Sequence, residues 1–282
     1  MKECPMDFPR TLQVSLSNLR HSWPEYWPGM DAVLQGCLGR LGLTLCLSDP
    51  EVSSWYRCTR DLALWLDQDG EKRRQDGLEP GYHNRLHTAD TLVCLTLLLQ
   101  AQRQLTTDDL AAPLRHERLS LLAMLAHDLL HDGGVNQFPA QLETRSVQAL
   151  SPLMQRHGMP PSDQALVRHL ILKTDAQVVS STHALIADRP FTAHDVDCLA
   201  VLVQEADVMA STLSSTGHAL TKNLAAEWAQ SNPTEASRLV TPEGRLRFLE
   251  RAALFSSPAS LLLGVQSARQ NEMLTLRQSL GY

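Results

Sequence analysis

The sequence predicts an all-α protein built as a compact multi-helix domain. Apolar residues recur at helical spacing over most of the 282 residues, and no long segment alternates apolar with polar residues as a strand would. No internal repeat and no strong linker divides the chain. Because 43% of the residues are hydrophobic, the chain can bury a large core. We therefore expect one helical domain over residues 1–282.

The charge, the cysteines and the apolar runs of the sequence argue against several classes of protein. The net charge of −6 argues against a general nucleic-acid binder. Cysteines at positions 4, 37, 46, 58, 94 and 198 form no CxxC pair and are typical of scattered reduced thiols. The N-terminus lacks the apolar core of a signal peptide, and apolar runs such as Leu92–Leu99 are too short to span a bilayer. These observations predict a soluble, cytoplasmic protein without a membrane partner.

The first 80 residues are expected to pack on the body that follows. Residues 1–28 are rich in proline and tryptophan, which predicts an irregular lead-in. Helical spacing over 31–43 predicts the first helix, and the Asp-Pro pair at 49–50 opens a second over about 51–68. The polar segment 67–81, with several glycines, predicts a loop.

The remaining helices make up the segment 80–255 and the C-terminal end. A helix is expected over about 83–103, a new start at 106–109, and a central helix from about His116. The stretch 180–189 is polar and is expected to lie outside the helices. The other predicted helices span about 141–156, 161–173, 192–211, 216–230, 243–256 and 258–278.

A histidine-aspartate cluster follows the apolar half of the central helix. On a helix His127 and His131 lie one turn apart, and Asp128 lies ~100° round from His127, so all three can face one hollow. Imidazole and carboxylate groups in a dry hollow are costly unless compensated, and a metal ion is a common compensation. The alternative is a helix with two surface histidines and a glycine stop.

Two further segments supply residues of the same types. His83 and His87 are one turn apart, and Asp90 shares their face. Asp207 lies in an otherwise apolar helix, where it either caps an unseen break or pairs with a cation. Two imidazoles with two carboxylates suit a zinc-like ion, while carboxylate and water ligands suit a harder ion such as magnesium or manganese.

The motifs around these residues resemble those of class I cyclic-nucleotide phosphodiesterases. YHNRLHTAD at 82–90 resembles the family signature YHNxxHAxD, and HDLLHDGGVNQF at 127–138 resembles HDxxHxGxxNxF. ILKTD at 171–175 is similar to the family's ILxTD, and EADVMAS at 205–211 stands where the family has its AD motif. The resemblance covers about 80–255. It implies the helical catalytic domain of that family.

The resemblance also implies a two-metal site and the roles of its residues. The implied ligands of the first ion, Zn²⁺, are His87, His127, Asp128 and Asp207. Asp128 would bridge to a second ion, Mg²⁺ or Mn²⁺, held mostly by water. His83 is the implied general acid, and His131 would lie near the bridging hydroxide and the phosphate. The implied supporting residues are Asn84, Asp90, Glu143 and Asp175.

The substrate-binding positions depart from the family pattern. The family's LExHH helix loses its paired histidines after Glu143, and its asparagine three residues past the metal-binding aspartate is Ala210. The segment RLRFLE aligns Phe248 with the family's base-stacking phenylalanine and places Arg245 where a glutamine reads the purine. An arginine cannot make the donor-plus-acceptor pair of an amide. Phe248 and Arg245 are the candidate substrate contacts.

The resemblance implies hydrolysis of a 3′,5′-cyclic nucleotide, cAMP or cGMP, to the 5′-monophosphate by a metal-bridging hydroxide. The changed positions leave open the same chemistry on another phosphodiester or phosphomonoester. A third alternative is a silent sensor that binds a nucleotide. In each case the partner is a small anionic molecule. The amphipathic stretch Leu261–Leu280 packs on the body or on a second subunit, as in a homodimer.

Overall fold

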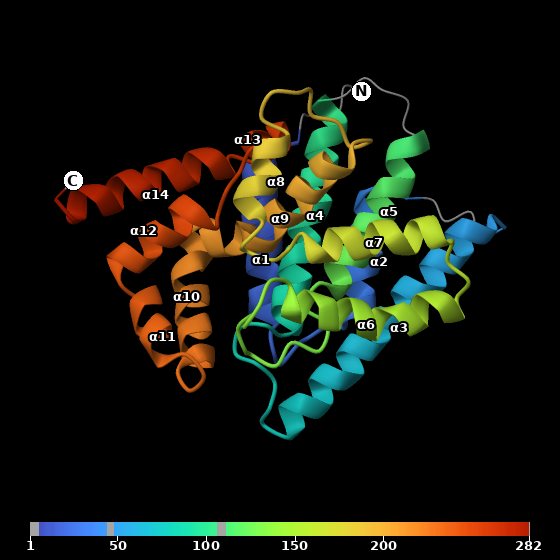
Figure 1. Ribbon diagram of the computed structural model, residues 1–282, viewed down its shortest axis with the longest axis horizontal. Helices are drawn as coiled ribbons and strands as arrows, with labels where there is room; N and C mark the ends of the chain where they lie inside the picture. The colour runs from blue at the N-terminus through green and yellow to red at the C-terminus, as the bar shows by residue number, and fades with distance from the viewer. Residues whose placement is uncertain (1–5, 44–47, 106–110, 282) are drawn as a thin grey trace.

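Fourteen α-helices build the computed structural model of the chain, which describes residues 6–43, 48–105 and 111–281 (Figure 1). No strand occurs in these ranges, so the all-α prediction is confirmed. The helices are α1 (Phe8–Ser22), α2 (Met30–Arg40), α3 (Pro50–Gln75), α4 (Arg85–Leu105), α5 (Ala111–Ala126), α6 (Gln141–Arg156), α7 (Pro161–Leu172), α8 (Val179–Leu185), α9 (Val196–Thr212), α10 (Ser214–Trp228), α11 (Pro233–Leu239), α12 (Pro242–Arg251), α13 (Pro258–Leu262) and α14 (Val265–Ser279).

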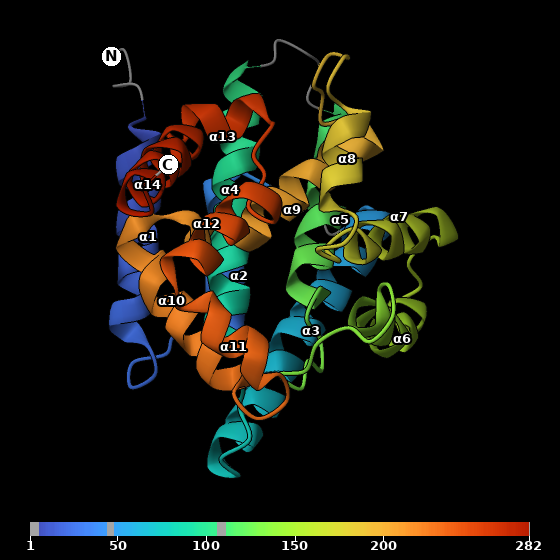
Figure 2. The ribbon, with the colours of Figure 1, turned by 60° about the vertical axis from the view of Figure 1, so that its left-hand side comes forward.

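Helix α4 lies at the centre and is buried along most of its length. It packs against α1, α2, α5, α9 and α13, and Figure 2 shows α1 on one side of it and α5 on the other. The apolar run Leu92–Leu99 belongs to this core helix, where its leucines are fully buried. The ring of neighbouring helices therefore fixes α4 in place, and α4 carries His87 of the candidate site.

Residues 8–22 form helix α1, so the irregular lead-in expected over 1–28 is wrong for this part. The Asp7 side chain accepts a hydrogen bond from the Arg10 N–H and caps the helix start. Phe8, Leu12 and Leu16 then recur every four residues and are buried. This apolar stripe packs α1 against α4, and the helix forms despite the prolines and tryptophans nearby in the sequence.

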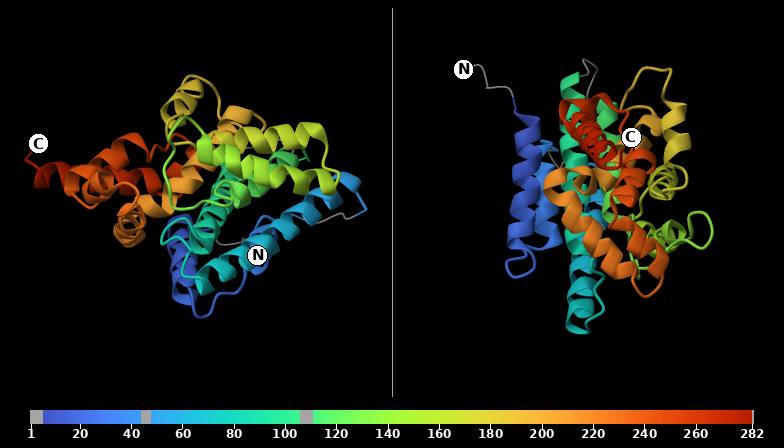
Figure 3. Two further views of the ribbon diagram at one scale, coloured as in Figure 1. Left: turned by 60° about the horizontal axis from the view of Figure 1, so that its bottom comes forward. Right: turned by 90° about the vertical axis from the view of Figure 1, so that its left-hand side faces the viewer.

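Helix α3 runs to Gln75, so the loop expected over 67–81 is wrong for its first half. An ion pair between Asp69 and Arg73 bridges successive turns of this polar end. Gly70 lies within this helix, and its lack of a side chain lets Arg85 pack against it. Figure 3 shows the end of α3 projecting beyond the neighbouring helices.

The other predictions differ from the structure mainly in their bounds. The helices expected over 141–156 and 161–173 match α6 and α7 closely. Helix α8 occupies part of the polar stretch 180–189, and α11 was not predicted. The long C-terminal helix is divided at Gly264, whose φ of 73° separates α13 from α14. The helix start expected at 106–109 lies outside the described residues.

Two predictions from composition can be compared with the described residues. Cys37, Cys58, Cys94 and Cys198 are free and buried, as expected of structural thiols; Cys4 and Cys46 lie outside the described ranges. Burial raises the pKa of the Cys37 thiol to about 11. Within the described ranges, none of the helices combines the length and the apolar character needed to cross a bilayer.

Candidate metal centre and active site

The His-Asp motif lies in a turn at the end of α5. The sequence predicted that the helix continues through His131, but α5 ends at Ala126. Leu130 adopts a φ of 62°, and the His131 N–H donates to the Asp128 carbonyl at 3.0 Å, so the chain turns instead of continuing as a helix. The turn places His127 and Asp128 in one group of side chains and His131 in another.

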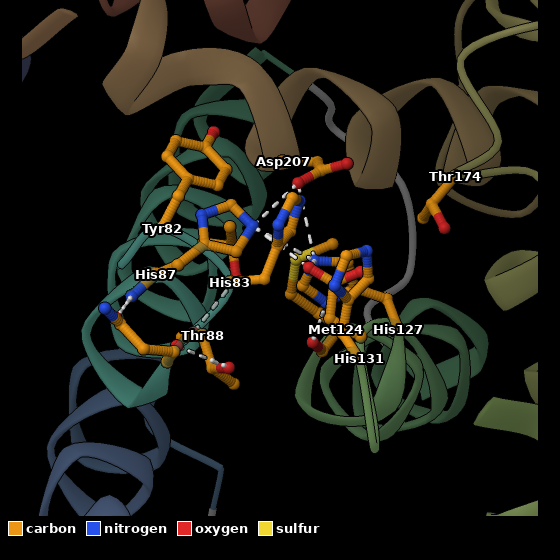
Figure 4. Close-up of polar contacts among 12 residues, drawn as sticks. Tyr82, His83, His87, Thr88, Met124, His127, His131, Thr174 and Asp207 are labelled. Atoms are coloured by element: carbon orange, nitrogen blue, oxygen red, sulfur yellow. Dashed lines mark hydrogen bonds and ion pairs between the residues drawn. The ribbon is translucent and has the colours of Figure 1, made fainter. Parts of the chain in front are cut away.

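Four side chains from three segments converge on one point, and Figure 4 shows three of them, His87, His127 and Asp207. His87 comes from α4, His127 and Asp128 from the turn after α5, and Asp207 from α9. The His127 Nε2 atom lies 3.1 Å from Asp128 Oδ2, 3.4 Å from Asp207 Oδ1 and 3.4 Å from His87 Nε2. His87 Nε2 lies 3.3 Å from each of the same two carboxylate oxygens.

These spacings fit the edges of a coordination shell. Nitrogen and oxygen ligands at about 2.1 Å from a tetrahedral ion lie about 3.4 Å from one another. The His127 Nδ1 atom is 2.7 Å from the Met124 carbonyl oxygen, to which it donates its proton. The Nε2 lone pair of His127 therefore faces the other donors, as a ligand's must. The group could hold a divalent metal ion.

The charges of this cluster also favour a cation at its centre. Burial opposes protonation of His87, but Asp128 and Asp207 outweigh it and raise its pKa to about 9. Burial likewise opposes the charge of Asp128, yet His127 holds the pKa of that carboxyl well below its usual range. Two half-buried carboxylates thus favour positive charge beside them, and a metal ion supplies it in place of two imidazole protons.

A second group joins His83, His131 and Glu227 next to the first. The Nδ1 atom of His83 lies 2.5 Å from Glu227 Oε1. Glu227 Oε2 accepts the backbone N–H groups of Tyr82 at 2.7 Å and His83 at 3.0 Å. Burial opposes the charge of Glu227, but the His83 side chain offsets this and lowers its pKa. Glu227 therefore fixes the orientation of His83.

His131 stacks on His83, with ring centroids 3.8 Å apart and planes inclined by 21°. Its Nδ1 atom accepts the Gly133 N–H at 3.0 Å, so the neutral ring carries its proton on Nε2. Burial, and then the charge of His83, lowers the pKa of His131 to about 4. At neutral pH His131 is a neutral hydrogen-bond donor.

Asn84 shapes the loop that presents His83 and His87. Its Oδ1 accepts the backbone N–H groups of Leu86 at 3.0 Å and His87 at 3.2 Å, which caps the start of α4. Its Nδ2 donates to the carbonyls of Pro80 and Gly81, both at 3.1 Å. The side chain therefore joins the loop to the helix immediately before His87.

The three acidic residues expected to support the ligands have distinct partners. Glu143 accepts both its hydrogen bonds from Asn136, at 3.0 and 3.3 Å, and burial raises its pKa. Asp175 accepts the Ala140 N–H at 2.8 Å and so ties the loop before α6 to the end of α7. Asp90 makes a two-pronged ion pair with Arg20 of α1, at 2.7 and 2.8 Å.

Arg245, which was expected to contact the substrate, is buried and paired. Its guanidinium donates to both carboxylate oxygens of Glu272 and to the carbonyls of Ser211 and Thr212. Four of its N–H donors are therefore already in use. Phe248 is half-buried beside it and lines, with Tyr82, a small cavity between α9, α10 and α12.

Glu227 is the residue that the sequence did not reveal. No motif marks it, and it lies 144 positions from His83 in the chain. The only signal is that it is the one acidic residue in the sequence of α10. That signal is weak, because a single acid on a helix is usually a solvated surface residue.

Comparisons with known proteins place the fold. No protein-family model and no curated protein sequence matches the chain. The structure of LmjPDEB1 in complex with IBMX is similar with a TM-score of 0.64 and 16% identity, over 99% of this chain and 95% of that one. The phosphodiesterase domain of the RhoPDE fusion protein from the choanoflagellate Salpingoeca rosetta is similar with a TM-score of 0.59 and 13% identity, over 99% and 94%. The chain has the fold of these phosphodiesterase domains.

Proposed function

We propose that the chain is a metal-dependent phosphodiester hydrolase whose substrate is a 3′,5′-cyclic nucleotide. The observation that carries the proposal is the group formed by His87, His127, Asp128 and Asp207, beside the His83–Glu227 pair. In this group each imidazole Nε2 lies 3.1 to 3.4 Å from the other imidazole and from an oxygen of each carboxylate. Similarity in fold to two proteins named as phosphodiesterases supports the same class of reaction.

Divalent ions would supply the electrophilic part of this chemistry. Two imidazoles and two carboxylates suit Zn²⁺ at the first position, and Asp128 would share a second ion, Mg²⁺ or Mn²⁺, that keeps most of its water. When bound, such ions lower the pKa of water and neutralise phosphate charge.

The proton needed by the leaving oxygen comes from His83. An alkoxide is a poor leaving group, so a proton donor must lie within hydrogen-bond reach of it. Glu227 engages Nδ1 of His83 and leaves Nε2 to face the substrate. The Nε2–H of the neutral His131 ring is then available to a phosphate oxygen. The two histidines divide the work, one giving a proton and the other holding the phosphate.

A second candidate is the same reaction on a different phosphodiester or a phosphomonoester. Arg245 aligns with the glutamine that reads the base in the family. The observation in favour of this candidate is that Arg245 donates its hydrogen bonds to Glu272 and to main-chain carbonyls, not to a ligand site. Ala210 likewise offers no side-chain hydrogen bond to a base. A silent nucleotide sensor is disfavoured, since the full set of ligand and acid side chains is in place.

Hydrolysis by the purified protein tests the proposal. Cyclic AMP, cyclic GMP and bis(p-nitrophenyl) phosphate are compared with Mn²⁺, Mg²⁺ or Zn²⁺, and His127→Ala is the control. Turnover of a cyclic nucleotide that is lost in His127→Ala supports the proposal. Turnover of the aryl diester alone favours the second candidate. Metal binding without turnover of either cyclic nucleotide contradicts the proposal.

A further inference from the structure

We propose that the ion pair between Arg245 of α12 and Glu272 of α14 positions one wall of the active site. Through this pair the C-terminal helix α14 helps to hold the active-site residues in position. The inference rests on the proposed function, because its first readout is hydrolysis. It assigns Arg245 and Glu272 as positioning residues that act through Ser211 and Tyr82.

The pair is buried and two-pronged. Arg245 Nε lies 2.7 Å from Glu272 Oε1, and Nη2 lies 3.0 Å from Oε2. The side chains are only 5% and 10% exposed. Parallel hydrogen bonds between a guanidinium and a carboxylate fix the direction of both groups, and low exposure protects them from screening. The position of the Arg245 guanidinium is therefore set by α14.

The same guanidinium holds the end of α9, the helix that carries Asp207. Nη1 donates to the Ser211 carbonyl at 2.6 Å, and Nη2 donates to the Thr212 carbonyl at 3.1 Å. Carbonyls in the last turn of a helix lack intrahelical partners and favour a cation. Gly217 makes room for this contact, since a Cβ there would come within 2.7 Å of Nη2.

Ser211 passes this constraint to the catalytic histidines. Its Oγ lies 2.8 Å from the Tyr82 hydroxyl. The Tyr82 ring in turn lies against two imidazoles, with centroid separations of 4.7 Å to His83 and 4.8 Å to His87 (Figure 4). A continuous series of contacts therefore runs from Glu272 to the proposed acid and to a proposed metal ligand.

The chain contains a matched control for this pair. Arg277 of α14 also forms an ion pair with α12, at 2.8 Å to Glu250. The side chains of Arg277 and Glu250 are 45% and 37% exposed, and their ion pair does not involve α9. Glu250→Gln and Glu272→Gln both remove a carboxylate that joins α12 to α14. Only Glu272→Gln breaks the series of contacts that leads to Tyr82.

Steady-state kinetics of the full-length variants test the proposal. We expect Glu272→Gln to lower kcat by about ten-fold, with KM changed less than kcat. Tyr82→Phe keeps the ring and removes the hydroxyl, and should give a similar loss. Because both act through one series of contacts, the double variant should lose little more than either single variant. Glu250→Gln should keep wild-type kcat.

Several results would overturn the proposal. One is a Glu272→Gln variant that melts earlier but retains wild-type kcat well below its melting temperature. Another is a double variant whose losses multiply. If Glu272→Gln does not fold, Tyr82→Phe and Ser211→Ala carry the test, because each removes only one oxygen. Wild-type kcat in both of these variants would refute the proposal.

A readout that does not require turnover separates this inference from the proposed function. If the wild type hydrolyses no substrate, the proposed function fails, and Co²⁺ binding then tests the positioning. The visible absorption of Co²⁺ depends on the geometry of His87 and its fellow ligands. Glu272→Gln and Tyr82→Phe should alter the spectrum, whereas Glu250→Gln should not. Identical spectra in all four proteins would overturn the inference.

Discussion

Replacement of Glu227 by glutamine isolates the contribution of the His83–Glu227 pair. Both carboxylate oxygens act as acceptors: Oε1 faces His83 Nδ1 at 2.5 Å, and Oε2 receives the N–H groups of Tyr82 and His83 at 2.7 and 3.0 Å. A glutamine has one oxygen and one NH₂ group. In one orientation the NH₂ group faces the two backbone N–H groups. In the other it faces His83 Nδ1, which can then no longer carry a proton. The variant keeps the shape of the side chain but cannot keep the pattern of hydrogen bonds.

The expected loss follows from the kind of bond that is removed. A hydrogen bond to a charged group contributes about 1.5–3 kcal/mol. If that energy holds His83 in its proton-donating orientation in the transition state, kcat falls by about 10- to 150-fold, at 1.36 kcal/mol per factor of ten. KM should change little, since Glu227 does not face the substrate.

The assay is kcat and KM against pH for the wild type and for Glu227→Gln on the best substrate found. Glu117→Gln is the control, because Glu117 is a buried glutamate ion-paired to Arg103 between α4 and α5. The control should unfold at a lower temperature but retain kcat and its pH profile. A Glu227→Gln enzyme with wild-type kcat would refute the role given to the pair.

Three further predictions concern metal binding and stability. His127→Ala should weaken binding of the first ion by at least about 100-fold, since even residues behind a ligand cost 10- to 100-fold, and a competition titration with a chromophoric chelator measures it. Gly70→Ala should destabilise the fold by about 1–3 kcal/mol, because the new Cβ would overlap the Arg85 side chain. Denaturant unfolding measures this change, and an unchanged midpoint would contradict the packing described. Burial raises the pKa of Glu205 to about 7. The folded protein therefore binds this proton more tightly than the unfolded chain, and stability should fall by about 3 kcal/mol as pH rises from 4.5 to 7, a slope that Glu205→Gln removes.

The sequence predicted the helical class and the metal-type residues because both are local patterns. Helical spacing of apolar residues identifies a helix wherever one face is buried, as in α6 and α7. His83, His87, His127 and Asp128 lie in two short motifs whose spacing can be read directly. The end of α5 could not be predicted, since the left-handed Leu130 that turns the chain is not a residue type that favours this conformation.

The residues that could not be predicted depend on contacts between distant segments. Glu227 becomes a partner of His83 only when α10 packs beside the loop before α4. Arg245 looked like a free substrate contact because the sequence does not show that Glu272 reaches it from α14. The polar end of α3 was predicted to be a loop because the local sequence does not show that Arg85 packs on Gly70. In each case the deciding partner lies at least 15 positions away along the chain.

The ion pair between Asp90 and Arg20 determines how much of the chain the metal-binding helix requires. Asp90 is fully buried on α4, three residues after His87, and the positive charge beside it comes from α1, which carries no recognisable motif. A fragment limited to residues 80–255 would leave the Asp90 carboxylate buried without its arginine. It would also expose the apolar surface of the body on which Phe8, Leu12 and Leu16 pack. The smallest fragment able to assemble the site therefore begins before α1, although the first histidine motif begins some 70 residues later.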